Sequence, residues 1–102
     1  MPRIFKIGGY LVYFWSNENS PLEPVHVHVS KGIPSEGTTK IWITRSGRCL
    51  LCNNNSHIPQ RDLRIIMDVI EARNKEILEK WYGYFKEISF YCGTAEAAGI
   101  SS

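Results

Sequence analysis

The strictest pattern in this chain is the segment Val25-His26-Val27-His28-Val29, in which valine and histidine alternate. Successive side chains of a β-strand point to opposite faces, so the three valines share one face and the two histidines share the other. The segment is therefore predicted to be a strand whose valine face is buried. A fold that contains it must supply a second apolar layer for that face.

Other segments of the first half also carry strand signals, namely β-branched and aromatic residues bounded by glycine, proline, asparagine or serine. Gly8-Gly9 is predicted to be the turn of a hairpin. The segments 16–24 and 31–38 are predicted to be loops, and residues 53–56 close the sheet region. The predicted strands are residues 4–7, 10–15, 25–29, 40–44 and 48–52.

The period of the apolar residues changes after Pro59, a residue that suits the first turn of a helix. From there the large apolar residues recur mostly at three- and four-residue steps, which is typical of an amphipathic helix. The stripe consists of Leu63, Ile66, Met67, Ile70, Ile77, Trp81, Phe85 and Ile88. Asn74 falls where the stripe requires an apolar residue, so a helix over about 59–87 is predicted to break near residues 72–74.

The predicted fold class is α+β: a small, mostly antiparallel sheet of about five strands packed on one long or broken C-terminal helix. A chain of 102 residues has room for one hydrophobic core, so residues 1–92 are predicted to form a single domain. In residues 93–102 the only large apolar residue is Ile100. That segment is predicted to be a flexible tail.

The amino-acid composition favours a globular domain over a disordered or membrane-spanning chain. Hydrophobic residues make up 43% and charged residues 22%, which is ordinary for a globular domain. The longest uncharged apolar run, residues 10–15, is far shorter than the roughly 20 residues of a membrane-spanning helix, and the N-terminus lacks the apolar block of a secretory signal. With three cysteines, an odd number, the chain is expected to keep reduced thiols in the cytoplasm.

The net charge of +2 is distributed unevenly. Residues 1–60 carry six Lys and Arg against three acidic residues, whereas residues 61–102 carry six against seven. The first half is mildly basic, which could favour an anionic partner. It is far from the dense cationic stripe of a protein held on nucleic acid mainly by phosphate contacts.

His26 and His28 are the first candidates for chemistry, because the pattern places them side by side on a face that no later segment is expected to cover. Three roles fit this half-exposed pair. The imidazoles could be structural, bonded to neighbouring strands or loops. They could act in acid–base catalysis or bind a substrate phosphate, since imidazole titrates near neutral pH. They could also supply half of a metal site.

We expect no metal and no cofactor. Further ligands would have to come from Glu18, Glu23, His57, Asp62 or a cysteine, and the sequence does not bring them together. Cys49-Leu50-Leu51-Cys52 has the spacing of zinc and redox motifs, but on a strand this spacing sends the two sulfurs to opposite faces. Phosphate loops, nucleophile elbows and the H-E-x-x-H motif are absent from the sequence.

The strand predicted over residues 10–15 is apolar on both faces. Either loop residues or a partner must cover its second face, and the partner is a different protein or a second copy of the chain. The aromatic residues could also stack on single-stranded bases, beside the basic Arg3, Lys6 and Lys40. The candidate binding residues are Tyr13, Trp15, Trp42, Lys31, Lys40 and Glu18.

Several motifs together resemble a small bacterial domain-of-unknown-function family. The most specific element is Asn17-Glu18 followed by a Pro-x-His-x-His motif at residues 24–28. The likeness covers about residues 1–88 and also rests on Met1-Pro2-Arg3-Ile4, Tyr10, Phe14, Ser16, Pro59-Gln60-Arg61, Leu63, Ile66, Ile70, Ile77 and Trp81.

Genes of the family commonly lie beside a gene for another small domain, and the two are regarded as a type II toxin–antitoxin module. The resemblance thus implies a growth-inhibiting toxin, neutralised by a small protein antitoxin and directed at a target such as RNA. His26 and His28 would then make the acid–base or phosphate contacts, while the aromatic face docks the antitoxin. The alternative is a non-catalytic protein- or nucleic-acid-binding module whose histidines are structural.

Overall fold

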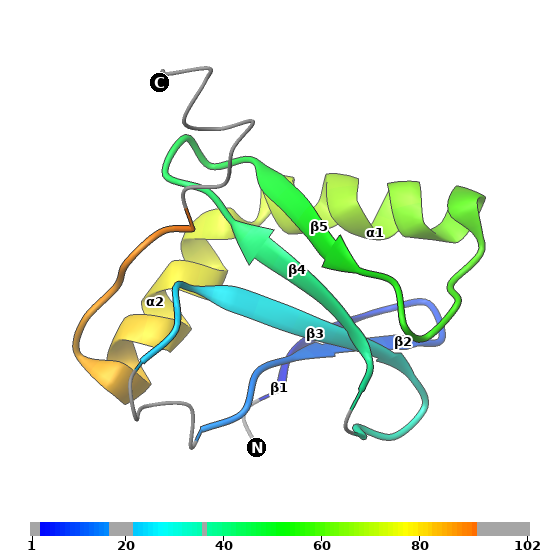
Figure 1. Cartoon of the computed structure of the whole chain (residues 1–102), viewed down its shortest axis with the longest axis horizontal. Coiled ribbons are helices and arrows are strands. Elements are labelled where there is room, and N and C mark those ends of the chain that lie inside the picture. Colours follow the sequence, from blue (N-terminus) through cyan, green and yellow to red (C-terminus); the bar gives the residue numbers. More distant parts are fainter. Residues whose placement is uncertain (1–2, 17–21, 36, 92–102) are drawn as a thin grey trace.

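Five consecutive strands form one antiparallel sheet in which each strand pairs with the next along the chain, in the order β1-β2-β3-β4-β5 (Figure 1). The computed structural model describes residues 3–16, 22–35 and 37–91. All five predicted strands are present, with ends shifted by one or two residues. Their bounds are β1 Arg3–Ile7, β2 Tyr10–Tyr13, β3 His26–Lys31, β4 Thr39–Ile43 and β5 Cys49–Asn53.

Two helices follow the sheet, α1 over Gln60–Ala72 and α2 over Asn74–Phe85. They meet at Arg73, so the predicted break is confirmed. The Asn74 side chain explains it, because Asn74 Nδ2 donates to the carbonyl of Glu71 at 2.8 Å and satisfies a backbone acceptor at the end of α1. Lys86 ends α2 in the left-handed conformation, with its N–H donating to the carbonyl of Tyr82. Within the described ranges, neither helix is long and apolar enough to cross a bilayer.

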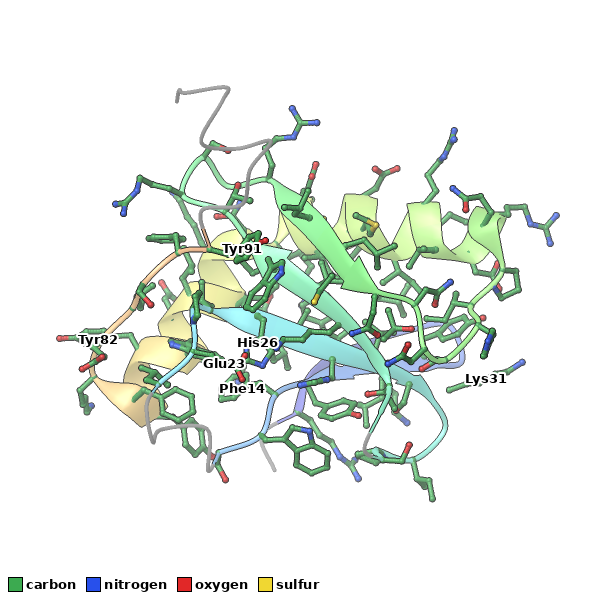
Figure 2. The ribbon with its side chains drawn as sticks, in the orientation of Figure 1. Phe14, Glu23, His26, Lys31, Tyr82 and Tyr91 are labelled. Carbon is green, nitrogen blue, oxygen red and sulfur yellow. The ribbon has the colours of Figure 1, made fainter. Side chains whose placement is uncertain are left out.

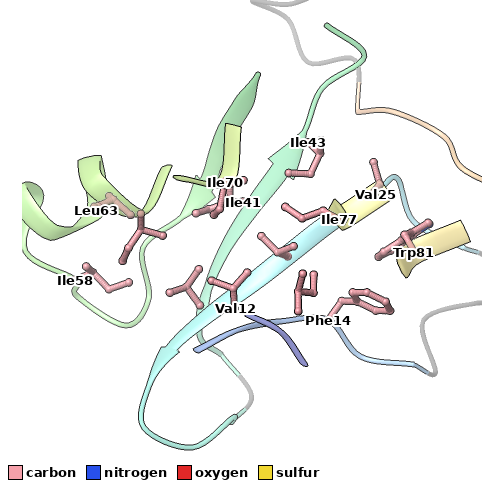
Figure 3. Close-up of a cluster of buried hydrophobic side chains, with 14 residues drawn as sticks. Val12, Phe14, Val25, Ile41, Ile43, Ile58, Leu63, Ile70, Ile77 and Trp81 are labelled. Atoms are coloured by element: carbon pink, nitrogen blue, oxygen red, sulfur yellow. The ribbon is translucent and has the colours of Figure 1, made fainter. Parts of the chain in front are cut away.

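Both helices pack on one face of the sheet, and the core lies between these two layers (Figure 3). Val25, Val27 and Val29 are completely buried in this core, as their alternation predicts. The architecture is therefore the expected α+β fold. The other members of the core are Ile4, Val12, Phe14, Ile41, Ile43, Ile58, Leu63, Ile66, Ile70, Ile77 and Trp81.

The segment after α2 turns back along the end of the sheet instead of leaving the domain (Figure 1). The N–H of Val25 donates to the carbonyl of Ser89 at 2.9 Å, which ties this segment to the start of β3. Tyr91 then reaches the sheet face opposite the helices, where its ring stacks on Trp42. The expectation that no later segment covers this face is therefore wrong at Trp42. The tail predicted over 93–102 lies outside the described residues.

Candidate functional site

Ring side chains from three adjacent strands form a continuous row on the sheet face opposite the helices. In the strand register Tyr13 lies opposite His28, and His26 lies opposite Trp42. The centroid separations along the row are 5.7 Å for Tyr13–His28, 5.1 Å for His28–His26 and 5.6 Å for His26–Trp42. With Trp15 at one end and Tyr91 at the other, we call this set of six side chains the ring row.

His26 lies at the centre of the ring row and is completely buried. Its Nδ1 is 2.9 Å from the carbonyl oxygen of Pro24, and because a carbonyl only accepts, Nδ1 carries a proton and donates it. The ring of Trp81, from α2, lies edge-on at 5.3 Å. The expected half-exposure is therefore wrong for His26, because the turn before β3 and the end of α2 close over it.

His28 is half-buried and lies closer to solvent than His26. Its ring stacks on Tyr13 with an interplanar angle of 25°, and the Trp15 ring lies 6.4 Å away. Across the β3–β4 pair it is opposite Lys40. His28 is partly exposed as a residue, but both of its ring nitrogens are buried.

Tyr13 shows what covers the second face of β2. It is completely buried, and its hydroxyl donates to the carbonyl of Ser35 at 3.1 Å and lies 3.0 Å from Thr38 Oγ1. Both contacts come from the loop between β3 and β4. A loop therefore covers Tyr13, and of the aromatic residues proposed for docking on this strand, only Trp15 stays half-exposed.

At the other end of the ring row, the ammonium group of Lys40 lies between the Trp42 ring and the Glu23 carboxylate. The Tyr91 ring is nearly parallel to that of Trp42, at 3° and a centroid separation of 4.6 Å. Lys40 Nζ lies 4.4 Å from the centroid of the Trp42 ring and 2.6 Å from Glu23 Oε1. Lys40 is thus fixed between an aromatic ring and a carboxylate, and Figure 2 shows Glu23, His26 and Tyr91 on this side of the sheet.

The structure brings most of the predicted site residues together, but not all of them. Lys31 is exposed near the far end of β3, well away from His26 (Figure 2). Glu18 lies outside the described residues. Sequence reasoning did not include Tyr91 in the site, and it placed Glu23 only among possible metal ligands. Both belong to connecting segments, where no periodicity marks a functional position.

A comparison with protein-family models matches residues 9–82 to a family described as "Domain of unknown function (DUF4160)". The chain belongs to the DUF4160 family. The matched region spans β2 to most of α2 and includes both histidines, Lys40 and Trp42. No curated protein and no solved structure matches the chain.

The two cysteines of β5 diverge in this DUF4160 domain, as their spacing predicts. Cys49 Sγ donates to the carbonyl of Met67 in α1 at 3.5 Å, whereas Cys52 is exposed. Burial, and secondly the nearby Glu71 carboxylate, raises the pKa of the Cys49 thiol to about 12. The N–H of Cys49 donates to Glu71, which lowers the pKa of that carboxyl. Across residues 3–16, 22–35 and 37–91, no three His, Cys, Asp or Glu side chains are placed to hold a metal ion.

Proposed function

We propose that this DUF4160 domain is the growth-inhibiting toxin of a toxin–antitoxin pair, that a small protein antitoxin neutralises it, and that the ring row is the surface it applies to RNA. The toxin assignment rests on the resemblance of the Asn17-Glu18 and Pro-x-His-x-His motifs. The observation that supports RNA as the target is the half-buried Trp42 ring with Lys40 held over it. Aromatic rings beside a cation suit the stacked bases and phosphates of a single strand.

Within this proposal the two histidines have different tasks. His28 lies opposite Lys40, and we assign to it the exchange of a proton with the substrate or the contact to a phosphate. Because both of its ring nitrogens are buried, a neighbouring side chain must move aside before the substrate reaches them. His26 is sealed beneath the surface, with its ring centroid 5.1 Å from that of His28. It therefore acts as a positioning residue that fixes the His28 ring.

A non-catalytic binding module is the second candidate function. The observation that favours it is the complete burial of His26, together with the hydrogen bond from Nδ1 to Pro24. A buried, hydrogen-bonded histidine needs no chemistry to explain its presence. If His28 is structural as well, the ring row would bind a partner without transforming it.

Growth measurements separate the two candidates. The domain is expressed alone and together with its neighbouring gene, and we expect growth arrest in the first case and relief in the second. His28→Asn should remove the arrest while the purified variant keeps its fold. The matched control is His57→Asn, because His57 is exposed on a loop and asparagine tolerates its positive φ of 57°.

Each contrary result has a definite reading. A wild-type domain that does not slow growth would contradict the toxin proposal. A folded His28→Asn variant that still arrests growth would contradict the catalytic role of His28 and favour the binding module. Loss of arrest in His57→Asn as well would show that the assay responds to expression level and not to the ring row.

A further inference from the structure

The segment after α2, residues 86–91, runs along the end of the sheet, and we call it the strap (Figure 1). Ile88 and Phe90 are half-buried and pack against the core. Between them, the Ser89 carbonyl accepts a 2.9 Å hydrogen bond from the backbone N–H of the residue directly before β3. Three successive residues therefore anchor the strap to the domain.

Tyr91, the next residue, has a different environment from these anchors. Its ring lies parallel to the Trp42 ring, at 3° and 4.6 Å, and neither ring is part of the hydrophobic core. Both residues are half-buried, so the stack lies at the surface. Among the described residues no hydrogen bond holds the Tyr91 hydroxyl, whereas that of Tyr13 contacts the loop between β3 and β4. Tyr91 can therefore leave Trp42 by rotation of its own side chain, without opening the core.

Two contacts at this end of the ring row have the chemistry of a bound nucleotide. A flat ring stacked on Trp42 is the contact that a base would make, and here Tyr91 supplies the ring. An oxyanion 2.6 Å from Lys40 Nζ is the contact that a phosphate would make, and here Glu23 supplies the anion. Side chains of the domain itself thus occupy the positions that the base and phosphate of a single strand require.

The comparison with the DUF4160 family separates the stacking surface from its cover. The family model matches residues 9–82, which include Lys40 and Trp42, whereas the strap follows the matched region. The ring on which a base would stack is therefore within the shared region, and Tyr91 lies outside it. This separation favours a regulatory contact over a component of the binding surface.

We propose that Tyr91 is an autoinhibitory cap, whose ring occupies the face of Trp42 on which an RNA base stacks, while Glu23 occupies Lys40 in the same closed state. This inference rests on the proposed function, because it takes a single strand of RNA as the ligand. RNA must displace Tyr91 before it stacks, so the lost ring contact lowers the apparent affinity. A stack of two aromatic rings corresponds to a factor of about 2–10 in an equilibrium constant, and the cap weakens binding by about that factor.

Fluorescence anisotropy with a short fluorescein-labelled oligouridylate tests the cap, because the bases of this probe are unpaired and free to stack. Tyr91→Ala should bind about 2- to 10-fold more tightly than wild type, and Tyr91→Phe, which keeps the ring, should bind like wild type. Glu23→Gln should also bind more tightly, since it removes the carboxylate that competes with a phosphate. The matched control is Tyr82→Ala, which removes a 52% exposed tyrosine from α2, away from the ring row, and should leave the affinity unchanged (Figure 2).

A second measurement needs no RNA. Acrylamide should quench the tryptophan fluorescence of Tyr91→Ala more than that of Tyr91→Phe or Tyr82→Ala, because only the first substitution uncovers Trp42. Circular dichroism confirms that each variant is folded. An unfolded Tyr91→Ala variant would contradict the premise that this ring leaves without opening the core, and unchanged quenching would show that Tyr91 does not cover Trp42 in solution.

The binding data separate failure of the cap from failure of the RNA proposal. If wild type and Tyr91→Ala bind the probe equally well, the cap is wrong and the RNA proposal stands. Weaker binding by Tyr91→Ala would also overturn the cap, because Tyr91 would then contribute to the bound state. If the probe binds to none of the variants even though quenching shows Trp42 uncovered, the RNA proposal fails and the cap fails with it.

Discussion

Replacing His26 with alanine tests how much this buried imidazole contributes to the stability of the fold. The ring is fully buried, donates one hydrogen bond to Pro24, and has the rings of His28, Trp42 and Trp81 at 5.1, 5.6 and 5.3 Å. A lost hydrogen bond costs about 1 kcal/mol, and edge-on ring contacts contribute about 0.5–1.5 kcal/mol each. We therefore expect the free energy of unfolding to fall by about 3 kcal/mol, the low end for removing a buried ring.

Urea denaturation, followed by tryptophan fluorescence and far-UV circular dichroism, measures this loss. Truncation of the half-buried His28 to alanine removes contacts with the rings of Tyr13, Trp15 and His26 and should lower the free energy of unfolding by about 2 kcal/mol. The exposed His57→Asn control should stay within about 0.5 kcal/mol of wild type. The m-value should not change, so that the midpoint shift reports stability alone. A folded His26→Ala variant within about 0.5 kcal/mol of wild type would refute the reasoning.

Three further predictions concern the loop after β5 and the cysteines. Asn54 Oδ1 accepts hydrogen bonds from the Thr39 hydroxyl and the Ile58 N–H, and Asn54 Nδ2 donates to the Ile58 carbonyl. The carboxylate of Asn54→Asp cannot donate to that carbonyl, so urea titrations should show a loss of about 2 kcal/mol in the free energy of unfolding at pH 7. The loss should be smaller at pH 4, where a protonated carboxyl can donate. A thiol reagent at neutral pH should modify Cys52 and spare Cys49 in peptide maps of the folded protein. The unfolded Cys49 thiol ionises near 9.0, while the folded pKa is about 12, so stability should decline as pH rises between these values, and less so in Cys49→Ala.

Local patterns were sufficient to predict the elements of the fold. The alternation over residues 25–29 predicts a strand and its buried valine face, because a period of two is a property of the strand itself. Asn74 marks the break between the helices for an equally local reason, since its amide bonds the carbonyl of Glu71. The divergence of Cys49 and Cys52 follows from the same alternation.

The environment of the ring row could not be predicted in the same way. The alternation places His26 on the face opposite the valines, but it does not say what covers that face. The cover comes from Trp81, far along the chain in α2, and from the return of the segment that carries Tyr91. Those contacts depend on where distant segments pack against the sheet, and hydrophobic periodicity predicts only local elements, not long-range contacts.

Under the proposed function, RNA would have to displace some of the contacts that now cover the ring row. A partly exposed ion pair such as Lys40–Glu23 contributes about 0–1 kcal/mol, so a phosphate could replace the carboxylate at little cost. Displacing Tyr91 from Trp42 costs about 0.5–1.5 kcal/mol, whereas a base stacked on an aromatic ring contributes about 1–3 kcal/mol. The exchange is therefore balanced or favourable, provided that the Trp42 ring stays in place. The buried His26, which packs edge-on against Trp42, supplies that rigidity.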